Sequence, residues 1–421
     1  MKRGPALLAV CLCGLLVASS YSQQNPQNIV VVAQDGSGDI QGDTEQPIVE
    51  AIRRMVEAGG GTVRIKEGAY IIHDTIGFGP DVHDLVIEGA GEVVLKLAPQ
   101  IRTTAAAELK PGDARMIVAD ASAFKPNMQI EIQAEGRKDS FSGYQTKSFS
   151  MRVKSVEGSE IEFTGPTKYG APAGTNVVQL VNLFQMDRAK RLTLRGLTLD
   201  GDMKKEDMRP ISHVFHCGVF GQGPYTYEKG PTGPPVEDIT IENCIIRNFF
   251  HRGIALYSVV RPTVLNCTVE NTMAEAVDFD HFCTHCVARG NNLSRAPVGV
   301  EMNDASYCLI EGNTIRECGV GVNIWQWCKL DNLNVENKIV GNTILDTKNT
   351  AIRCAKGADR NLIEGNTIKG GAAVGIVLQG ADNIARKNTI TDLGKEAMLV
   401  QGTGNQTEEN VVTNCKEPAK K

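Results

Sequence analysis

Residues 308–326 read CLIEGNTIRECGVGVNIWQ, and closely related stretches return along the second half of the chain. Two other copies read NLIEGNTIKGGAAVGIVLQ (361–379) and NIARKNTITDLGKEAMLVQ (383–401). Each copy places short apolar runs of β type between turns of Gly and Asn, without a helical period. Such a repeat predicts a β-solenoid, in which each copy forms one coil and neighbouring coils share a continuous core.

A recurring asparagine marks the period of the repeat. The intervals between its copies are 23, 25, 22, 29, 24, 22 and 22 residues, and the copies are Asn243, Asn266, Asn291, Asn313, Asn342, Asn366, Asn388 and Asn410. Asparagines stacked at one turn can hydrogen-bond from coil to coil. We therefore expect an asparagine ladder with a structural role only.

One strand of each coil can be sorted by face, because side chains alternate along a strand. Two columns of apolar residues are predicted to point inward. The first is Ile254, Val277, Val300, Val322, Ile352, Ile376 and Met398, and the second is Leu256, Phe279, Met302, Ile324, Cys354, Leu378 and Val400. Their uniform character supports this register.

The residues between these columns are predicted to point outward, and in the middle coils they are charged, amide or aromatic. The first outward column is Ala255, Asp278, Glu301, Asn323, Arg353, Val377 and Leu399. The second is Tyr257, Asp280, Asn303, Trp325, Ala355, Gln379 and Gln401, and just beyond it lie Ser258, His281, Asp304, Gln326 and Lys356. We place function on this outward patch.

Length and charge narrow the class of protein. A solenoid absorbs 421 residues in one body, and 43 glycines suit a turn-rich β protein. The net charge is −5 and there is no basic block, so nucleic acid is not an expected partner. We expect a monomer.

The N-terminus has the pattern of a secretory signal peptide, which we assign to residues 1–22. Lys2 and Arg3 precede an apolar run, residues 6–18, that ends in small residues. The run is too short for a membrane-spanning helix, which needs about 20 apolar residues. We expect a secreted or periplasmic protein without a membrane span.

The rest of the chain is predicted to form three parts. Residues 23–100 contain a capping helix, with Thr44 as N-cap and a Gly stop at 59–61, and the first coils. Residues 101–183 break the period and alternate in short strands, which predicts a small inserted β-domain. Residues 184–421 form the remaining coils. The loop GQGPYTYEKGPTGPP (221–235) directly precedes the acidic coils and is expected to overhang them.

The capping helix, the DGSGD segment (35–39), the 22–25-residue coils and the GNTI turns together resemble the pectate lyase-like superfamily, including NosD-like repeat proteins. The resemblance covers about residues 28–98 and 190–415. It implies an all-β fold: a right-handed parallel β-helix with an N-terminal capping helix and a small inserted β-domain. Because polygalacturonases and alginate C5-epimerases share this fold, it also implies an acidic polysaccharide as partner.

Two local similarities imply chemistry. In calcium-dependent pectate lyases, carboxylates of adjacent coils bind Ca²⁺ beside a basic residue. The matching residues here are Asp278, Asp280, Glu301 and Asp304 for Ca²⁺, and Arg353 for the base. Alginate epimerases use a Tyr with an Asp and a His, which Tyr257, Asp280 and His281 resemble. The proline between Asp and His in the epimerase motif is absent here.

The carboxylates also allow other interpretations. Asp278 and Glu301 would lie about 4.8 Å apart on neighbouring coils, where they repel unless a cation or a proton intervenes. This spacing also suits the carboxyl pair of a retaining glycosidase. Alternatively, these residues form an ordinary solvated face.

We therefore expect an exported polysaccharide lyase or C5-epimerase that acts on a uronate-containing glycan. The candidate catalytic residues are Asp278, Asp280, His281, Glu301, Arg353 and Tyr257. The candidate substrate-binding residues are Trp325 (as an exposed stacking platform), Asn303, Asn323, Lys356, His251 and Arg252. The alternatives are a glycoside hydrolase using Asp278 and Glu301, and a non-catalytic carbohydrate-binding protein.

The cysteines have a structural interpretation. Cys244 is expected to stack on Cys267, and Cys286 on Cys308, either as bridges or as buried thiols. The segment Cys283-Thr-His-Cys286 resembles half a zinc site, but no second half follows at ligand spacing. We favour a structural role for it.

Overall fold

A computed structural model describes residues 28–79, 82–138, 145–212 and 214–416. The predicted signal peptide lies outside these residues. Within them, no helix is both long and apolar enough to cross a membrane.

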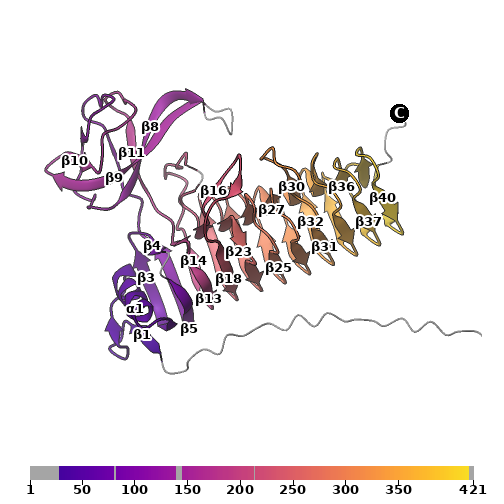
Figure 1. The fold of residues 1–421 in the computed structure, drawn as a ribbon, viewed down its shortest axis with the longest axis horizontal. Helices are drawn as coiled ribbons and strands as arrows, with labels where there is room; N and C mark the ends of the chain where they lie inside the picture. Colours follow the sequence, from indigo (N-terminus) through magenta and orange to yellow (C-terminus); the bar gives the residue numbers. More distant parts are fainter. Residues whose placement is uncertain (1–27, 80–81, 139–144, 213, 417–421) are drawn as a thin grey trace, which may run out of the picture.

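Parallel strands wind into a solenoid with three rows of strands. Two rows belong to a 23-stranded sheet and the third row is a separate 10-stranded sheet, counted over the described residues. Figure 1 shows the coils stacked from the N-terminal helix to the C-terminal end. The all-β parallel β-helix predicted from the repeat is therefore confirmed.

The first row contains β1 (Ile29–Ala33), β3 (Gly61–Ile72), β5 (His83–Leu97), β13 (Lys190–Arg195), β18 (Val236–Glu242), β22 (Thr263–Leu265), β25 (Val287–Arg289), β28 (Leu309–Glu311), β31 (Lys338–Val340), β34 (Leu362–Glu364), β37 (Ile384–Arg386) and β40 (Gln406–Glu408). The short β2 (Ile40–Gln41) and β21 (Val259–Val260) pair with it. The second row, which β3 and β5 also reach, contains β14 (Thr198–Asp200), β19 (Ile245–Phe249), β23 (Thr268–Thr272), β26 (Asn292–Ser294), β29 (Thr314–Arg316), β32 (Thr343–Thr347), β35 (Thr367–Gly371), β38 (Thr389–Thr391) and β41 (Val411–Thr413).

The third row carries the predicted patch. It contains β4 (Ile76–Phe78), β12 (Phe184–Asp187), β15 (Val219–Gln222), β20 (Ile254–Tyr257), β24 (Val277–Asp280), β27 (Val298–Asn303), β30 (Val320–Trp325), β33 (Thr350–Cys354), β36 (Val374–Leu378) and β39 (Met398–Val400). Its pairing confirms the predicted register, because Ile254, Val277, Val300, Val322, Ile352, Ile376 and Met398 are paired in succession. The inward side chains are buried until the last coil, where Met398 is half-buried and Val400 is exposed.

The helix α1 (Glu45–Glu57) closes the N-terminal end of the core. The Thr44 hydroxyl accepts a hydrogen bond from the Gln46 N–H, as expected of an N-cap. Ile48, Ala51 and Ile52 lie on the buried face of α1 and pack into the solenoid core. The predicted capping helix is therefore present, and it shields apolar residues that the first coil would otherwise expose.

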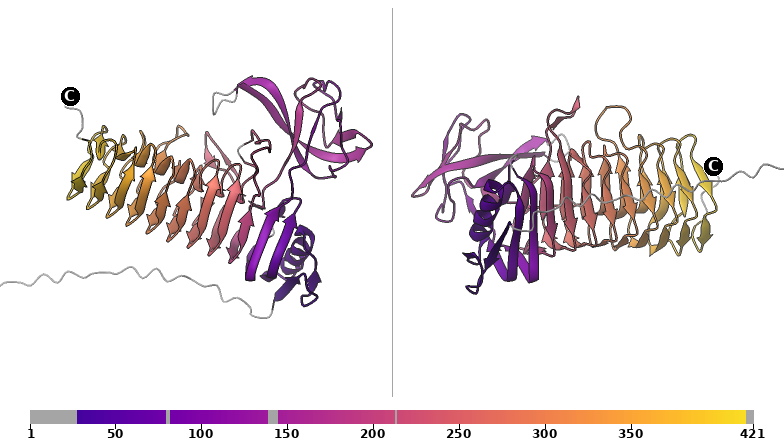
Figure 2. Two further views of the ribbon diagram at one scale, coloured as in Figure 1. Left: turned by 180° about the vertical axis from the view of Figure 1, so that it is seen from behind. Right: turned by 60° about the horizontal axis from the view of Figure 1, so that its bottom comes forward.

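A second, antiparallel sheet projects from the N-terminal end of the solenoid (Figure 2). Its six strands lie in the order β6 (Arg102–Thr104), β11 (Asn176–Leu180), β8 (Gln129–Lys138), β9 (Gln145–Glu157), β10 (Glu160–Phe163) and β7 (Arg115–Ile117). This inserted unit has its own apolar core, which includes Ile130, Ile161 and Phe163.

An asparagine ladder runs through the coils, but two of the eight asparagines predicted to belong to it do not. The ladder consists of Asn291, Asn313, Asn342, Asn366, Asn388 and Asn410, each linked to the next by hydrogen bonds of 2.9–3.0 Å. Asn243 and Asn266 instead have φ values of 54° and 52°, in the turn position that Gly312 and other glycines fill in later coils. Asparagine tolerates that left-handed conformation, so the motif is displaced by one residue in the early coils.

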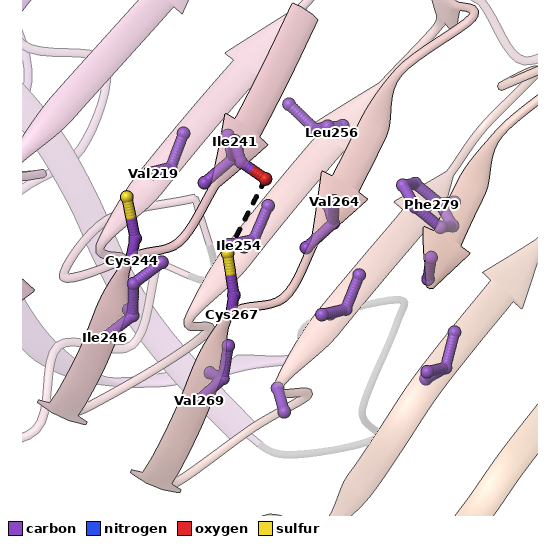
Figure 3. Close-up of a cluster of buried hydrophobic side chains, with 14 of the residues drawn as sticks. Val219, Ile241, Cys244, Ile246, Ile254, Leu256, Val264, Cys267, Val269 and Phe279 are labelled. Atoms are coloured by element: carbon purple, nitrogen blue, oxygen red, sulfur yellow. Dashed lines mark hydrogen bonds between the residues drawn. The ribbon is translucent and has the colours of Figure 1, made fainter. Parts of the chain in front are cut away.

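Cysteines take the ladder position in these early coils. The Cys267 N–H donates to the Asn291 Oδ1 at 2.9 Å, as a ladder asparagine would. Cys244 and Cys267 project side by side into the core, and the Cys267 thiol donates to the Ile241 carbonyl at 3.5 Å (Figure 3). The ten cysteines within the described residues carry free thiols. The predicted pairs Cys244/Cys267 and Cys286/Cys308 are therefore buried thiols rather than disulfide bridges.

A second asparagine ladder was not predicted. It consists of Asn337, Asn361, Asn383 and Asn405, with links of 2.8–3.0 Å. The Cys308 N–H donates to its first member at 2.9 Å. Both ladders satisfy buried backbone groups at turns, where strand pairing stops.

Replacing a central ladder residue should destabilise the fold markedly. The Asn342 amide makes four hydrogen bonds of 2.9 Å, to Asn313, Asn366 and the Ile310 carbonyl. Asn342→Ala should lower the free energy of unfolding by about 3 kcal/mol, because the buried partners lose their bonds. Asn410→Ala, at the half-buried end of the ladder, should cost about 1 kcal/mol. Urea unfolding followed by circular dichroism measures both, and equal losses would contradict the ladder's role.

Candidate functional site

The outward columns of the third row form one patch over β20, β24, β27 and β30. Asp278 pairs with Ala255 on one side and with Glu301 on the other, and Glu301 pairs with Asn323. In the next column, Tyr257 pairs with Asp280, and Asn303 with Trp325. The structure therefore brings these residues together on one face of the sheet.

The patch is buried, which corrects the expectation of a solvated groove. Asp278 is 1 % exposed and Glu301 is 7 % exposed. The segment after the inserted unit covers the neighbouring end of the patch, since Val214 and Tyr225 pack on an apolar cluster that includes Ala255 and Tyr257. A sequence reading of strand parity cannot predict such a cover.

The predicted overhang of loop 221–235 is present. This loop contains the hairpin β16 (Tyr225–Thr226) and β17 (Gly230–Pro231), which lies beside the third row (Figure 1). The rings of Tyr225 and Tyr227 lie 5.3 and 5.0 Å from the His281 ring. The hairpin therefore covers the histidine of the patch.

Arg252 is the guanidinium of the buried patch. Its Nε lies 2.7 Å from the Glu275 Oε2 and 2.7 Å from the Asp278 Oδ2, and its guanidinium lies 5.8 Å from the Tyr257 ring centre. Burial raises the pKa of Asp278 well above its usual range, Asp280 adds to the rise, and Arg252 opposes it. Arg252 was predicted to bind substrate, but here it is the counter-ion of two carboxylates.

Glu275 was missed from the sequence. It precedes β24 in the turn, where the alternation of side chains that sorted the patch no longer applies. His251 was predicted to line a groove, but its Nδ1 lies 2.6 Å from the Phe215 carbonyl. It therefore anchors the covering segment.

Glu301 is held by two hydrogen-bond donors. The Asn323 Nδ2 donates to the Oε2 at 3.1 Å, and the Trp325 Nε1 donates to the Oε1. Burial and the nearby Glu275 raise the pKa of Glu301 to about 8, although both donors act to lower it. Glu301 is therefore mostly protonated at neutral pH. Trp325 is half-buried and bonded to Glu301, so the prediction of an exposed platform is wrong.

Several buried acceptors around Glu301 have no hydrogen-bond donor among the described residues. They are the Asp278 Oδ1, whose neighbouring Oδ2 faces Arg252 at 2.7 Å, and the Oδ1 atoms of Asn303 and Asn323. Buried polar atoms in proteins are almost always hydrogen-bonded. These acceptors are therefore suited to a ligand that brings hydroxyl donors.

A second polar group lies beside Asp278 and Glu301. It consists of Tyr257, Asp280, His281 and Asp304. The His281 Nδ1 lies 3.1 Å from the Asp280 Oδ1 and 3.2 Å from the Asp304 Oδ2. Burial raises the pKa of Asp280 to about 6, while His281 and a hydrogen bond from Tyr257 oppose the rise. Burial also raises the pKa of Tyr257 well above its usual range.

The predicted calcium ligands do not converge. The Asp304 Oδ1 accepts the backbone N–H groups of Trp327 and Cys328 at 2.8 and 3.0 Å. Within the described part of the chain, no three of Asp278, Asp280, Glu301 and Asp304 bring ligand atoms within 4.8 Å of one another. Calcium therefore does not fit this quartet, and calcium binding by the protein stays a prediction.

Arg353 and Lys356 lie outside the buried patch. Both side chains are exposed, and the Arg353 guanidinium lies 3.4 Å from the Gln379 Oε1 on the next coil. Arg353 does follow Asn323 in the outward column. Arg353 thus lies two coils beyond Glu301, as the sequence indicates, and its role as a base or substrate-binding residue stays a prediction.

Comparison with known proteins agrees with this architecture. Residues 237–420 match the family described as periplasmic copper-binding protein (NosD). The A-module of mannuronan C-5 epimerase AlgE4 from Azotobacter vinelandii superposes with a TM-score of 0.51 at 16% identity, over 92% of this chain and 96% of that chain. The chain is a right-handed parallel β-helix protein.

Another solved structure, that of XylC in complex with xylose, superposes with a TM-score of 0.50 at 11% identity, over 88% of this chain and 70% of that chain. At these identities the likeness establishes the fold alone. No curated protein sequence matches the chain. The match to the NosD family model and the shared parallel β-helix fold agree with the resemblance drawn from the sequence.

The raised pKa of Glu301 predicts how stability depends on pH. Glu301 has an ordinary pKa of 4.5 and a folded pKa of about 8, so the native state holds the proton more tightly. This contribution to stability is fully present below about pH 4.5 and is lost as pH rises toward 8. The melting temperature should therefore fall between pH 5 and 8.5 in the wild type and fall less in Glu301→Gln.

A matched control for this pH series is Glu311→Gln, in β28 of the first row, which should keep the wild-type slope. Differential scanning calorimetry in buffers of constant ionic strength measures all three proteins. Parallel pH slopes for the wild type and Glu301→Gln would show that Glu301 does not hold a proton in the folded state.

Proposed function

We propose that this protein is an exported glycoside hydrolase of the retaining type, with Asp278 and Glu301 as its two carboxyl groups. The observation that carries the proposal is their direct pairing on adjacent strands, amid buried acceptors without a donor among the described residues. Adjacent strands lie about 4.8 Å apart, and retaining glycosidases place their carboxyl groups about 5–5.5 Å apart.

The two carboxyl groups lie in environments that suit different roles. Glu301, with a pKa of about 8, holds a proton that it can donate to the leaving glycosidic oxygen. Burial raises the pKa of Asp278, and Arg252, 2.7 Å away, opposes that rise and stabilises the carboxylate that a nucleophile requires. Asp278 attacks the anomeric carbon and forms a glycosyl ester as the glycosidic bond breaks. Glu301 then takes a proton from water, and that water cleaves the ester.

The charge of the patch supports a neutral sugar rather than a uronate. Four buried carboxyl groups, Asp278, Asp280, Glu301 and Asp304, face one guanidinium that is already paired with Asp278 and Glu275. A substrate carboxylate would add like charge at a site with low dielectric. Sugar hydroxyls would instead satisfy the acceptors of Asp278, Asn303 and Asn323.

Access to the pair requires movement. Because Asp278 is 1 % exposed, a glycan reaches it only if neighbouring groups shift. The hairpin rests on His281 through tyrosine rings. Its displacement would uncover His281 and leave the paired strands of the solenoid in place.

A second candidate is the lyase or C5-epimerase expected from the sequence. It is supported by the contact of the Tyr257 ring with the His281 ring at 5.3 Å and by the Asp280 carboxylate beside both. Tyr257 and His281 would then exchange the C5 proton of a uronate. This candidate is less well supported, because Arg252, which could pair with the carboxylate of a uronate, already contacts Glu275 and Asp278.

An activity screen separates the two candidates. In a screen of neutral and uronate polysaccharides, the protein should release reducing ends from a neutral glycan. The absorbance of a new C=C bond should not appear. Asp278→Asn and Glu301→Gln should each lower kcat at least ~100-fold, and azide should rescue Asp278→Ala. Glu311→Gln should retain full activity. Uronate-dependent absorbance that survives both substitutions would favour the lyase.

The rate should also depend on pH through Glu301. Because the general acid must be protonated, kcat should be constant near pH 6–7 and decline above about pH 8. In Glu301→Gln, substrates with a good leaving group should be hydrolysed without this alkaline decline. An unchanged alkaline limb in the variant would assign the proton donor to another residue.

A further inference from the structure

We infer that His281, Asp304 and Cys328 form a binding site for a divalent transition metal of the Zn²⁺ class. The three residues follow β24, β27 and β30 at the same corner of three successive coils. Their ligand atoms, one nitrogen, one carboxylate oxygen and one sulfur, all lie within 4.8 Å of one another, and all three side chains are buried. This inference does not depend on the proposed hydrolase.

The long turn after β30 builds the site. In this coil the repeat interval is 29 residues instead of 22–25, and Cys328 lies in the longer turn, close to Asp304. The Cys328 N–H lies 3.0 and 3.1 Å from the two oxygens of Asp304. The backbone at Cys328 is thereby tied to the carboxylate beside which its thiol lies.

The donors suit a borderline metal. Zn²⁺ is bound by thiolate, imidazole and carboxylate, whereas Ca²⁺ takes six to eight oxygen ligands. Three protein ligands leave one position of a tetrahedral ion for water or another ligand. The Asp304 Oδ1 accepts two backbone N–H groups, and its Oδ2, which the Cys328 N–H also approaches at 3.1 Å, lies 3.2 Å from the His281 Nδ1.

The surroundings orient and seal the ligands. The rings of Tyr225, Tyr227, Tyr257 and Phe282 lie 5.0–6.5 Å from the His281 ring. The Asp280 Oδ1 lies 3.1 Å from the His281 Nδ1 and fixes the rotation of the imidazole. The ring contacts and the Asp280 carboxylate thereby hold the His281 ring in place in the metal-free protein.

The cysteine motif that resembled half a zinc site is not this site. The Cys283 thiol donates to the Leu256 carbonyl at 3.0 Å, inside the core. His285 is exposed and stacks on Tyr307 with ring centres 5.3 Å apart. The ligands proposed here are instead 23 and 24 residues apart in sequence, and the coil register together with the turn after β30 brings them together.

Titration of the metal-free full-length protein tests the proposal. Zn²⁺ should bind with one equivalent by calorimetry and raise the melting temperature, and Ca²⁺ should leave it unchanged. Co²⁺ should give the near-ultraviolet charge-transfer band of a cobalt–thiolate bond. Cys328→Ser and His281→Gln should weaken Zn²⁺ binding at least ~100-fold and abolish that band.

Two matched variants serve as controls. Cys354→Ser removes another buried thiol, and His285→Ala removes the exposed histidine. Both should retain the wild-type affinity for Zn²⁺ and the wild-type cobalt spectrum. The proposal is overturned if the folded wild type binds no Zn²⁺, if Ca²⁺ stabilises it equally, or if Cys328→Ser keeps the cobalt–thiolate band. The wild-type spectrum decides the sulfur ligand even if a variant fails to fold.

Discussion

The in-register stacking of parallel coils is the constraint on which the rest of this structure depends. Each strand of the third row pairs with the equivalent strand of the next coil, so residues about 23 positions apart become direct neighbours. Apolar residues thereby form a continuous interior. The same register places Asp278 beside Glu301, and His281 beside Asp304.

This register is held at the turns as well as in the strands. Two asparagine ladders satisfy backbone groups where strand pairing stops, and cysteines take over the ladder positions in the earlier coils. The turns leave little freedom for a coil to slip, because a shift of one residue would break every ladder bond. The third row of strands is therefore rigid, and the polar residues on its outer face keep a defined spacing.

Burying several carboxyl groups on the third row of strands costs folding free energy. Asp278, Asp280 and Glu301 are almost fully buried, and their pKa values all lie above the usual range. A fold under selection for stability alone would place apolar residues there, as the later coils do with Val377 and Leu399. Violations of ordinary burial rules concentrate at functional sites, and this patch is such a concentration.

The sequence by itself determined the coils, their faces and the membership of the outward columns. These follow from two periods, alternation along a strand and the 22–29-residue repeat, and both are visible in the chain. The sequence predicted the wrong position for Asn243 and Asn266. Asparagine suits both the left-handed turn and the ladder, which are adjacent positions in each coil, so the residue type did not distinguish them. Only the tertiary structure decided the burial of the patch, the pairing of Arg252 with Glu275, and the approach of Cys328 to His281. These depend on turns and on a covering hairpin, whose paths are set by packing between distant segments rather than by any local period.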